Sequence, residues 1–222
     1  MQSMKTLADR KKEIQFLMKY AVPEAQAKEA SSVLDKYDSD VIAMNLLYSF
    51  YLQLPEGRDD SVIGIRFLAR RQGVFLLCAA AGSGMYYIYL VNNEAAHIIG
   101  TVAEGIIDRE LLDFFGYADN QEVLALTKKP ETLPEYEPQS ANPDLCPSCQ
   151  VAVGEFHTLG CPVEICPWCR GQLTYCNCRF TRLNVDTMEK AVQIEKLLEL
   201  LEEAGRIAFQ KEHAPGYPTV DQ

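Results

Sequence analysis

Seven of the eight cysteines fall between residues 146 and 178, together with one of the three histidines. These residues form four close pairs along the chain: Cys146 with Cys149, His157 with Cys161, Cys166 with Cys169, and Cys176 with Cys178. Thiolate sulfur and imidazole nitrogen are the donors that zinc takes in tetrahedral protein sites, four to each ion. Eight donors therefore predict that this segment binds two zinc ions per chain.

The spacing leaves open how the donors are divided between the two ions. Cys146-Pro-Ser-Cys149 and Cys166-Pro-Trp-Cys169 are Cys-x-x-Cys knuckles, each stiffened by a proline after the first cysteine. In a sequential partition the first two pairs share one ion and the last two pairs share the other. In a cross-brace the two knuckles hold one ion, and the second is held by His157, Cys161, Cys176 and Cys178. We favour the cross-brace, because interleaving joins a short segment into one unit.

The segment resembles known zinc fingers over residues 146–180. The four-residue gap between Cys161 and Cys166, with ligand pairs on both sides, is similar to the FYVE and PHD cross-brace fingers. The string His-Thr-Leu-Gly-Cys-Pro-Val-Glu-Ile-Cys-Pro-Trp-Cys-Arg-Gly-Gln-Leu also looks like the C-terminal zinc-ribbon or cross-brace module of uncharacterised bacterial proteins. The resemblance implies metal binding more firmly than any partner. FYVE fingers bind phosphoinositides through a basic cluster, which is missing after His157, so that function is not expected.

All eight donors are committed, so neither ion keeps a coordination position for water, and the sites are predicted to be structural instead of catalytic. Three alternatives remain open: one zinc with spare thiols, His157 as a residue that does not bind the metal, and a redox role for the Cys-x-x-Cys pairs. The redox role needs a βαβ setting, which the sequence does not indicate here. Elsewhere, Cys78 is predicted to be a small buried hydrophobe in a strand, and Trp168 is a candidate contact residue for a partner.

Charge and cysteine usage indicate the class of partner and the compartment. The 222 residues carry a formal net charge of −10, which argues against general affinity for nucleic acid or anionic membranes. Residues 146–182 hold three basic and two acidic groups, and seven thiolates with two Zn²⁺ bring that balance to −2. Residues 1–20 lack the apolar stretch of a signal peptide, so we expect a reducing cytoplasm, where paired cysteines bind metal.

The remaining pattern predicts an α+β fold: a helical N-terminal segment with a small antiparallel sheet, followed by a two-zinc finger module and a long C-terminal helix. Expected helices cover residues 5–19, 23–36, 41–54, 108–115 and 186–204. Expected strands cover residues 63–70, 74–80, 85–91 and 96–102, with a helix as the alternative for the first. The uncharged run 74–91 is interrupted by Gly82-Ser83-Gly84, which favours two strands around a turn over a membrane span.

The domain organisation follows from these elements. We expect an α+β domain at 1–128, a linker with four prolines at 129–143, a zinc-binding module at 144–182, and a helix with a tail at 183–222. The function favoured is a non-catalytic zinc-binding protein whose module contacts another protein. The first alternative is nucleic-acid binding by the zinc module, and the second is an enzyme whose site lies in the N-terminal domain. The C-terminal helix either packs on its own chain or forms a homodimer.

Overall fold

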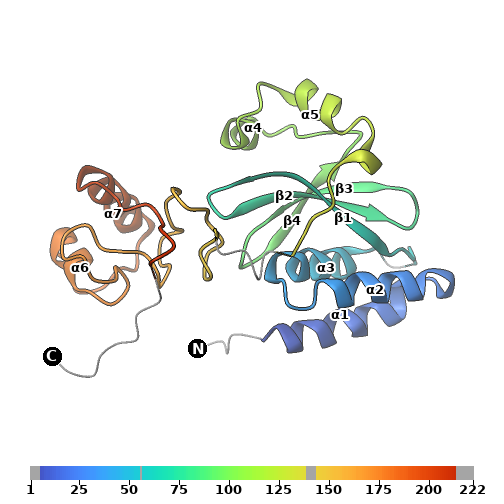
Figure 1. Cartoon of the computed structure of the whole chain (residues 1–222), viewed down its shortest axis with the longest axis horizontal. Helices are drawn as coiled ribbons and strands as arrows, with labels where there is room; N and C mark the ends of the chain where they lie inside the picture. Colours follow the sequence, from blue (N-terminus) through green and yellow to red (C-terminus); the bar gives the residue numbers. More distant parts are fainter. Residues whose placement is uncertain (1–5, 56, 139–143, 214–222) are drawn as a thin grey trace. The chain divides into compact units, whose positions relative to one another are not determined.

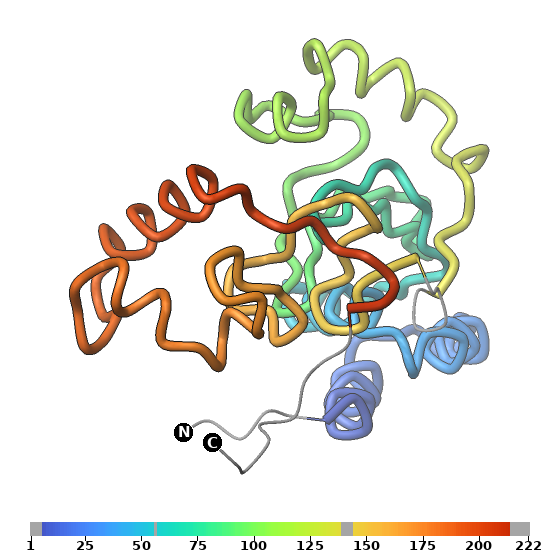
Figure 2. The backbone as a smooth tube through the Cα atoms, turned by 60° about the vertical axis from the view of Figure 1, so that its left-hand side comes forward, coloured from blue at the N-terminus to red at the C-terminus, as the bar shows by residue number. Residues whose placement is uncertain are grey.

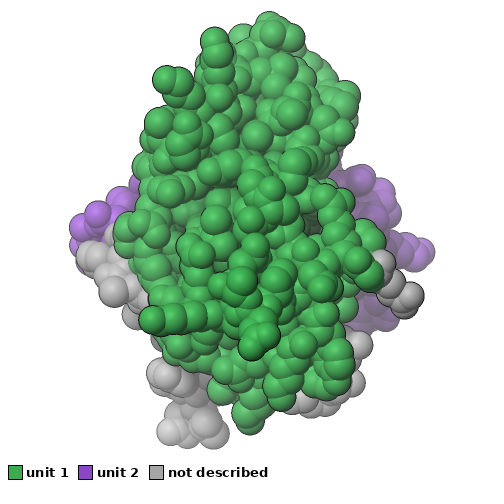
Figure 3. Space-filling view, turned by 90° about the vertical axis from the view of Figure 1, so that its right-hand side faces the viewer, with its two compact units in different colours: residues 1–141 green, residues 142–222 purple. Residues whose placement is uncertain are grey.

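The computed structural model describes residues 6–55, 57–138 and 144–213, and these belong to two compact units. Unit 1 comprises residues 1–141 and unit 2 residues 142–222 (Figure 3). The predicted fold class is confirmed: N-terminal helices, a four-stranded antiparallel sheet and a C-terminal helix, with the cysteines gathered in unit 2. The search for helices long and apolar enough to cross a membrane found none within the described ranges.

Three helices begin unit 1: α1 (Leu7–Ala21), α2 (Ala27–Lys36) and α3 (Val41–Gln53). Asp40 caps α3 by accepting a hydrogen bond of 2.7 Å from the backbone N–H of Ala43. Most residues of α3 are buried, so this helix lies at the centre of the N-terminal core. A helix that is apolar on nearly all sides is stable only when other elements surround it.

The sheet is a meander of β1 (Val62–Arg71), β2 (Val74–Ala81), β3 (Tyr86–Val91) and β4 (Ala96–Thr101), in that spatial order. The strand interpretation of the first segment is therefore correct, and the helix alternative is wrong. Gly82-Ser83-Gly84 forms the predicted turn between β2 and β3, and Asp60 fixes it by accepting hydrogen bonds from the backbone N–H and hydroxyl of Ser83.

The sheet is covered on both faces (Figure 1). Helices α1 to α3 pack on one face, where alternate residues of β2 such as Phe75 and Leu77 join the main core. On the other face Leu76 and Ile88 pack with residues of α4 (Arg109–Phe115) and α5 (Asn120–Leu126). Because β2 is buried on both faces, its sequence is a continuous apolar run.

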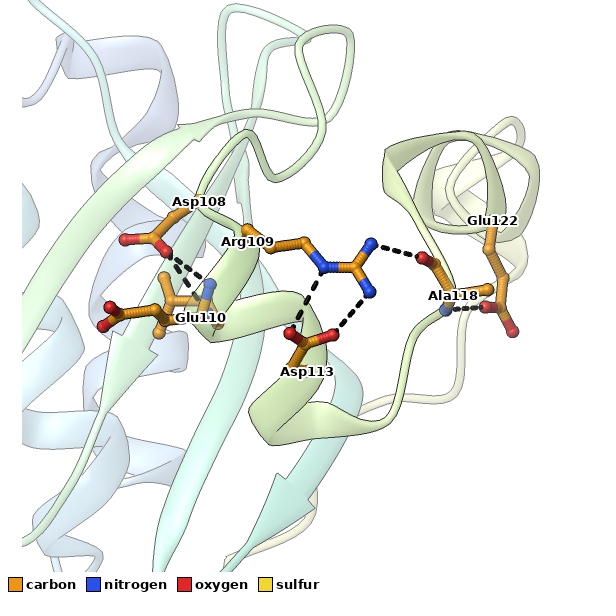
Figure 4. Close-up of polar contacts among 7 residues, drawn as sticks. Asp108, Arg109, Glu110, Asp113, Ala118 and Glu122 are labelled. Carbon is orange, nitrogen blue, oxygen red and sulfur yellow. Dashed lines mark hydrogen bonds and ion pairs between the residues drawn. The ribbon is translucent and has the colours of Figure 1, made fainter.

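A short polar network joins α4 to α5 (Figure 4). Asp108 caps α4 by accepting hydrogen bonds from the backbone N–H groups of Glu110 and Leu111 at 2.8 and 3.3 Å. Arg109 pairs with Asp113 and also donates to the carbonyl of Ala118, in the loop before α5. Helix α5 was not predicted from the sequence, because seven residues give too short a periodic pattern.

The first part of the predicted linker packs on unit 1 instead of extending freely. The backbone N–H of Tyr136 donates to Ile65 and that of Phe67 donates to Pro134, so the segment lies along the edge of β1. The buried hydroxyl of Tyr136 donates to Asp40. The buried ring of Tyr136 and the hydrogen bond of its hydroxyl to Asp40 hold this segment on unit 1. The prolines of the segment alone predict an extended chain. The rest of the predicted linker, 139–143, lies outside the described residues.

The described part of unit 2 contains two helices, α6 (Cys178–Leu183) and α7 (Ala191–Glu203), and isolated β-bridges join loop residues within it, Leu145 with Ala152 and Ile165 with Gln172. Helix α7 begins five residues later than the predicted start at Asp186. The reason is a cap at the later position, where Gln193 Oε1 accepts hydrogen bonds from the backbone N–H groups of Glu189 and Lys190 at 2.9 Å each. The predicted tail from residue 214 onward lies outside the described residues.

Candidate metal centre

The eight predicted donors come together as two groups of four, which follow one another along the chain. Cluster 1 consists of Cys146, Cys149, His157 and Cys161, and cluster 2 of Cys166, Cys169, Cys176 and Cys178. Within each cluster the four ligand atoms all lie within 4.8 Å of one another, so each could hold one metal ion. The partition is sequential. The cross-brace that we favoured from the sequence is wrong, because each knuckle meets the donor pair that follows it directly.

The two knuckles are local repeats of one backbone structure, displaced by 20 residues (146 to 166 and 149 to 169). The residues after the second cysteines, Gln150 and Arg170, have φ values of 62° and 63° and each donates its N–H to the carbonyl of the knuckle's first cysteine at 3.0 Å. Isolated bridges close both repeats, Leu145 with Ala152 and Ile165 with Gln172. Each knuckle is therefore completed within its own hairpin-like loop, which explains the sequential partition.

Cluster 1 has the dimensions of a tetrahedral zinc site. The Sγ atoms of Cys146 and Cys161 lie 3.7 Å apart, and Cys149 Sγ lies 3.3 Å from His157 Nδ1. Zinc–sulfur bonds of about 2.3 Å at tetrahedral angles place two sulfurs about 3.8 Å apart. The imidazole therefore presents Nδ1 to the three sulfurs, at a separation close to what one central ion requires.

All four donors of cluster 1 are buried. Val151, Val163 and Phe209 surround them, and the Phe209 ring lies edge-on to His157 with the ring centroids 5.3 Å apart. Phe209 comes from the segment after α7, which runs back across the loops of cluster 1 (Figure 2). Two backbone hydrogen bonds of 2.9 Å fix it there, from Gly154 to Phe209 and from Phe209 to Glu155.

Cluster 2 is more open to solvent. Cys166 is fully buried, Cys176 and Cys178 are half-buried, and Cys169 is exposed. On its buried side Cys166 packs with Leu173 and with Leu197 and Leu201 of α7. Helix α6 begins at Cys178, so this donor also defines the first turn of a helix. A metal at cluster 2 would thus hold the knuckle, the start of α6 and the surface on which α7 packs.

The protonation of the cysteines shows why these clusters suit a cation. Hydrogen bonds from Cys149 and Cys161 lower the pKa of Cys146, while hydrogen bonds with Cys146 and Cys149 raise the pKa of Cys161. In cluster 2, burial raises the pKa of Cys176 to about 12. Hydrogen bonding in cluster 1 and burial in cluster 2 therefore favour the protonated form of some of these thiols. A divalent ion would favour their thiolates instead, and its binding would release those protons.

The donor set fits a structural ion. Thiolate and imidazole are the ligands of structural zinc sites, and four protein donors complete the tetrahedron. No donor is left over in either cluster, so an ion bound here would keep no position for a reacting water.

Two residues that support cluster 1 were not predicted. Arg206 donates to the carboxylate of Glu164 and to the carbonyl of His157, and Phe209 covers the imidazole ring. Neither residue has a recognisable spacing to the donors, since Arg206 lies 49 residues after His157. The available signal was weak: an arginine directly after Gly205, which ends the predicted C-terminal helix, and a phenylalanine three residues further on.

Unit 1 holds the other candidate residues. Cys78 is completely buried, as predicted, and burial raises its pKa to about 12, so it stays a neutral thiol. Burial also raises the pKa of Tyr51 to about 12. One surface hollow of about 240 Å³ is lined mainly by apolar side chains of α3, the loop after it, β3 and β4, among them Phe50, Leu54, Tyr87 and Ile98. The raised pKa values of Cys78 and Tyr51 thus reflect burial in the core.

Comparison of the chain with family models, with curated proteins and with solved structures found no match.

Proposed function

We propose that the chain is a non-catalytic zinc protein, in which two structural zinc ions hold the C-terminal unit in shape and that unit binds another protein. The observation that carries the proposal is the arrangement of the eight donors as two complete tetrads, each with its ligand atoms within 4.8 Å. Soft thiolate donors in a tetrahedral arrangement select zinc over the hard cations magnesium and calcium. Histidine in cluster 1 disfavours an all-sulfur iron site there.

A contact surface for a protein partner lies beside cluster 2. Trp168, within the second knuckle, is half-buried, and the guanidinium of Arg182 in α6 lies 5.5 Å from the centroid of its ring. Tyr175, which directly precedes the donor Cys176, is 56% exposed. Tryptophan, tyrosine and arginine are the residues most enriched where protein interfaces concentrate their binding energy. The metal would hold these side chains in a fixed arrangement, which lowers the entropic cost of binding.

Charge favours a protein over a nucleic acid as the partner. Residues 144–213 include seven basic and ten acidic residues, so the described part of unit 2 is acidic before its thiolates are counted. Nucleic-acid binding depends on basic groups that displace counterions from phosphates. A gel shift at low salt tests this alternative directly, and we expect none with either DNA or RNA.

The test of the proposal compares Trp168→Ala with Val192→Ala, which removes a 62% exposed side chain of α7 in the same unit. Both variants should retain two zinc ions per chain by elemental analysis. Proteins captured from a lysate by the wild type and by Val192→Ala, but lost with Trp168→Ala and after chelation, would fit a metal-shaped contact surface. Capture that is unchanged by Trp168→Ala and by chelation would contradict it.

A further inference from the structure

Arg206 links the carboxylate of Glu164 to the backbone of His157, a candidate metal donor. Its Nε and Nη2 atoms lie 2.8 and 2.7 Å from Glu164 Oε1, and Nη2 also donates to the carbonyl oxygen of His157. Glu164 is 1% exposed and the Arg206 side chain 12% exposed, so water does not screen this ion pair. One planar guanidinium therefore holds Glu164 and His157 at a fixed separation.

The second polar atom of each side chain, His157 Nε2 and Glu164 Oε2, supports the same arrangement. Among the described residues, His157 Nε2 and Glu164 Oε2 are both buried and have no hydrogen-bond partner. A neutral histidine that binds a metal through Nδ1 carries its proton on Nε2 and needs an acceptor there. Arg206 holds the Glu164 carboxylate next to the His157 backbone, and Glu164 Oε2 is a buried oxygen of the type that can accept such a proton. Gln150 Oε1 is a second buried acceptor without a hydrogen-bond partner among the described residues. The experiment therefore has to distinguish Gln150 from Glu164 as the acceptor for His157 Nε2.

We propose that Glu164 and Arg206 are positioning residues of cluster 1, which orient His157 so that Nδ1 faces Cys146, Cys149 and Cys161. The inference rests on the proposed function, because it presumes that cluster 1 binds a metal. Glu164 lies between the last donor of cluster 1 and the first donor of cluster 2, and its carbonyl accepts a hydrogen bond from Leu173. Arg206 follows α7, which packs on cluster 2. The chain thus completes cluster 1 only after it has passed through cluster 2.

Cobalt(II) titration of the reduced full-length protein, stripped of metal and refolded, tests the inference. Tetrahedral cobalt absorbs visible light at wavelengths that depend on its donors, so a three-sulfur, one-nitrogen site and a four-sulfur site are followed separately. Removing an outer partner of a metal-bound histidine typically weakens affinity about 10- to 100-fold. We expect this loss at cluster 1 in Arg206→Ala and Glu164→Gln, with a shifted cobalt spectrum for that site and unchanged affinity at cluster 2.

Three controls separate positioning from general stability. Lys211→Ala removes another basic residue from the same segment, one whose ion pair with Asp144 is exposed, and should leave both sites unchanged. Gln150→Met removes the competing acceptor and should also leave them unchanged. Arg206→Lys keeps the charge but cannot span Glu164 and His157 together, so it should behave like Arg206→Ala.

Several results would overturn the inference. These are wild-type affinity at cluster 1 in Glu164→Gln, full recovery in Arg206→Lys, equal losses at both clusters, or a loss in Gln150→Met instead of Glu164→Gln. Failure of the proposed function is distinct from all of these, because the wild-type protein itself would then bind fewer than two cobalt ions. If Arg206→Ala does not refold, Glu164→Gln with its matched size carries the test alone.

Discussion

In the described part of unit 1 the main core consists of twenty buried residues from three helices, the sheet and Tyr136, whereas the buried clusters of unit 2 are small and contain cysteines of the two candidate metal sites. Three of the six residues in the first of these clusters are cysteines, and Cys166 is one of four in the second. A large apolar core stabilises a domain without any cross-link. A segment of about 70 residues with small cores usually needs disulfides or a metal.

The comparison therefore separates two sources of stability within one chain. Unit 1 depends on apolar burial, and Cys78 contributes to it only as a small buried side chain. On the proposed function unit 2 depends on coordination, because its buried clusters contain cysteines whose thiolate charge a bound cation would compensate. Each of the following predictions tests that difference between the units or the smaller difference between the two clusters.

The largest effect is expected from removing the metal. After exhaustive treatment with EDTA under reducing conditions, amide hydrogen exchange should become fast throughout residues 144–213, because binding energy and folding energy are the same quantity in a small metal module. Protection in β1 to β4 and α3 should not change. Slow exchange that persists in unit 2 after the metal has been shown to be gone would contradict the comparison.

A smaller effect is expected from losing one donor. Cys166→Ser should reduce the metal content from two ions to one and release α7, while the thermal transition of unit 1 stays in place. Cys78→Ala is the matched control: it should retain both ions and destabilise unit 1 by about 1 kcal/mol through the cavity it leaves. Elemental analysis and calorimetry check both variants, and loss of metal in Cys78→Ala would show that the units are not independent.

The difference between the clusters predicts an order of thiol reactivity. In the metal-bound protein Cys169, which is exposed, should be alkylated by iodoacetamide first, and the buried Cys146 and Cys161 last. Peptide mapping by mass spectrometry at a series of times measures this order. If Cys149, which has the same position in the first knuckle, reacts as fast as Cys169, the difference in burial has no chemical consequence.

The smallest effect is expected from one hydrogen bond in unit 1. Tyr136→Phe removes the donor to Asp40, and a buried acceptor that loses its partner costs about 1–3 kcal/mol. The free energy of unfolding of unit 1, measured with urea, should fall by that amount, and the zinc content should remain unchanged. A variant as stable as the wild type would show that the segment before residue 139 contributes little to unit 1.

The sequence was sufficient to predict eight candidate donors but not how they group into two clusters. Zinc requires cysteine and histidine in close pairs, and such pairs are visible in local sequence. The sequential and cross-brace partitions use the same eight residues, so only the backbone distinguishes them. The deciding feature is a repeat of hydrogen bonds, from Val153 to Asp144 and from Leu173 to Glu164, which closes each knuckle on itself.

Hydrophobic periodicity predicted the long helices and strands. It did not predict the short helices or the contacts between residues far apart in the sequence. The alternation in β1 and the apolar length of α3 were enough to place both. Helices α5 and α6 are too short for a periodic pattern, and α6 depends on the position of Cys178. The attachment of Tyr136 to Asp40 and of Arg206 to Glu164 joins residues 96 and 42 positions apart, which a single sequence does not reveal.

The most direct test of the account is the metal content of the protein purified under reducing conditions without added metal. Elemental analysis against a protein concentration from amino-acid analysis should give two zinc ions per chain, one for each set of four donors. A value near one, a value near zero, or another metal in place of zinc would contradict the assignment of both clusters as structural zinc sites.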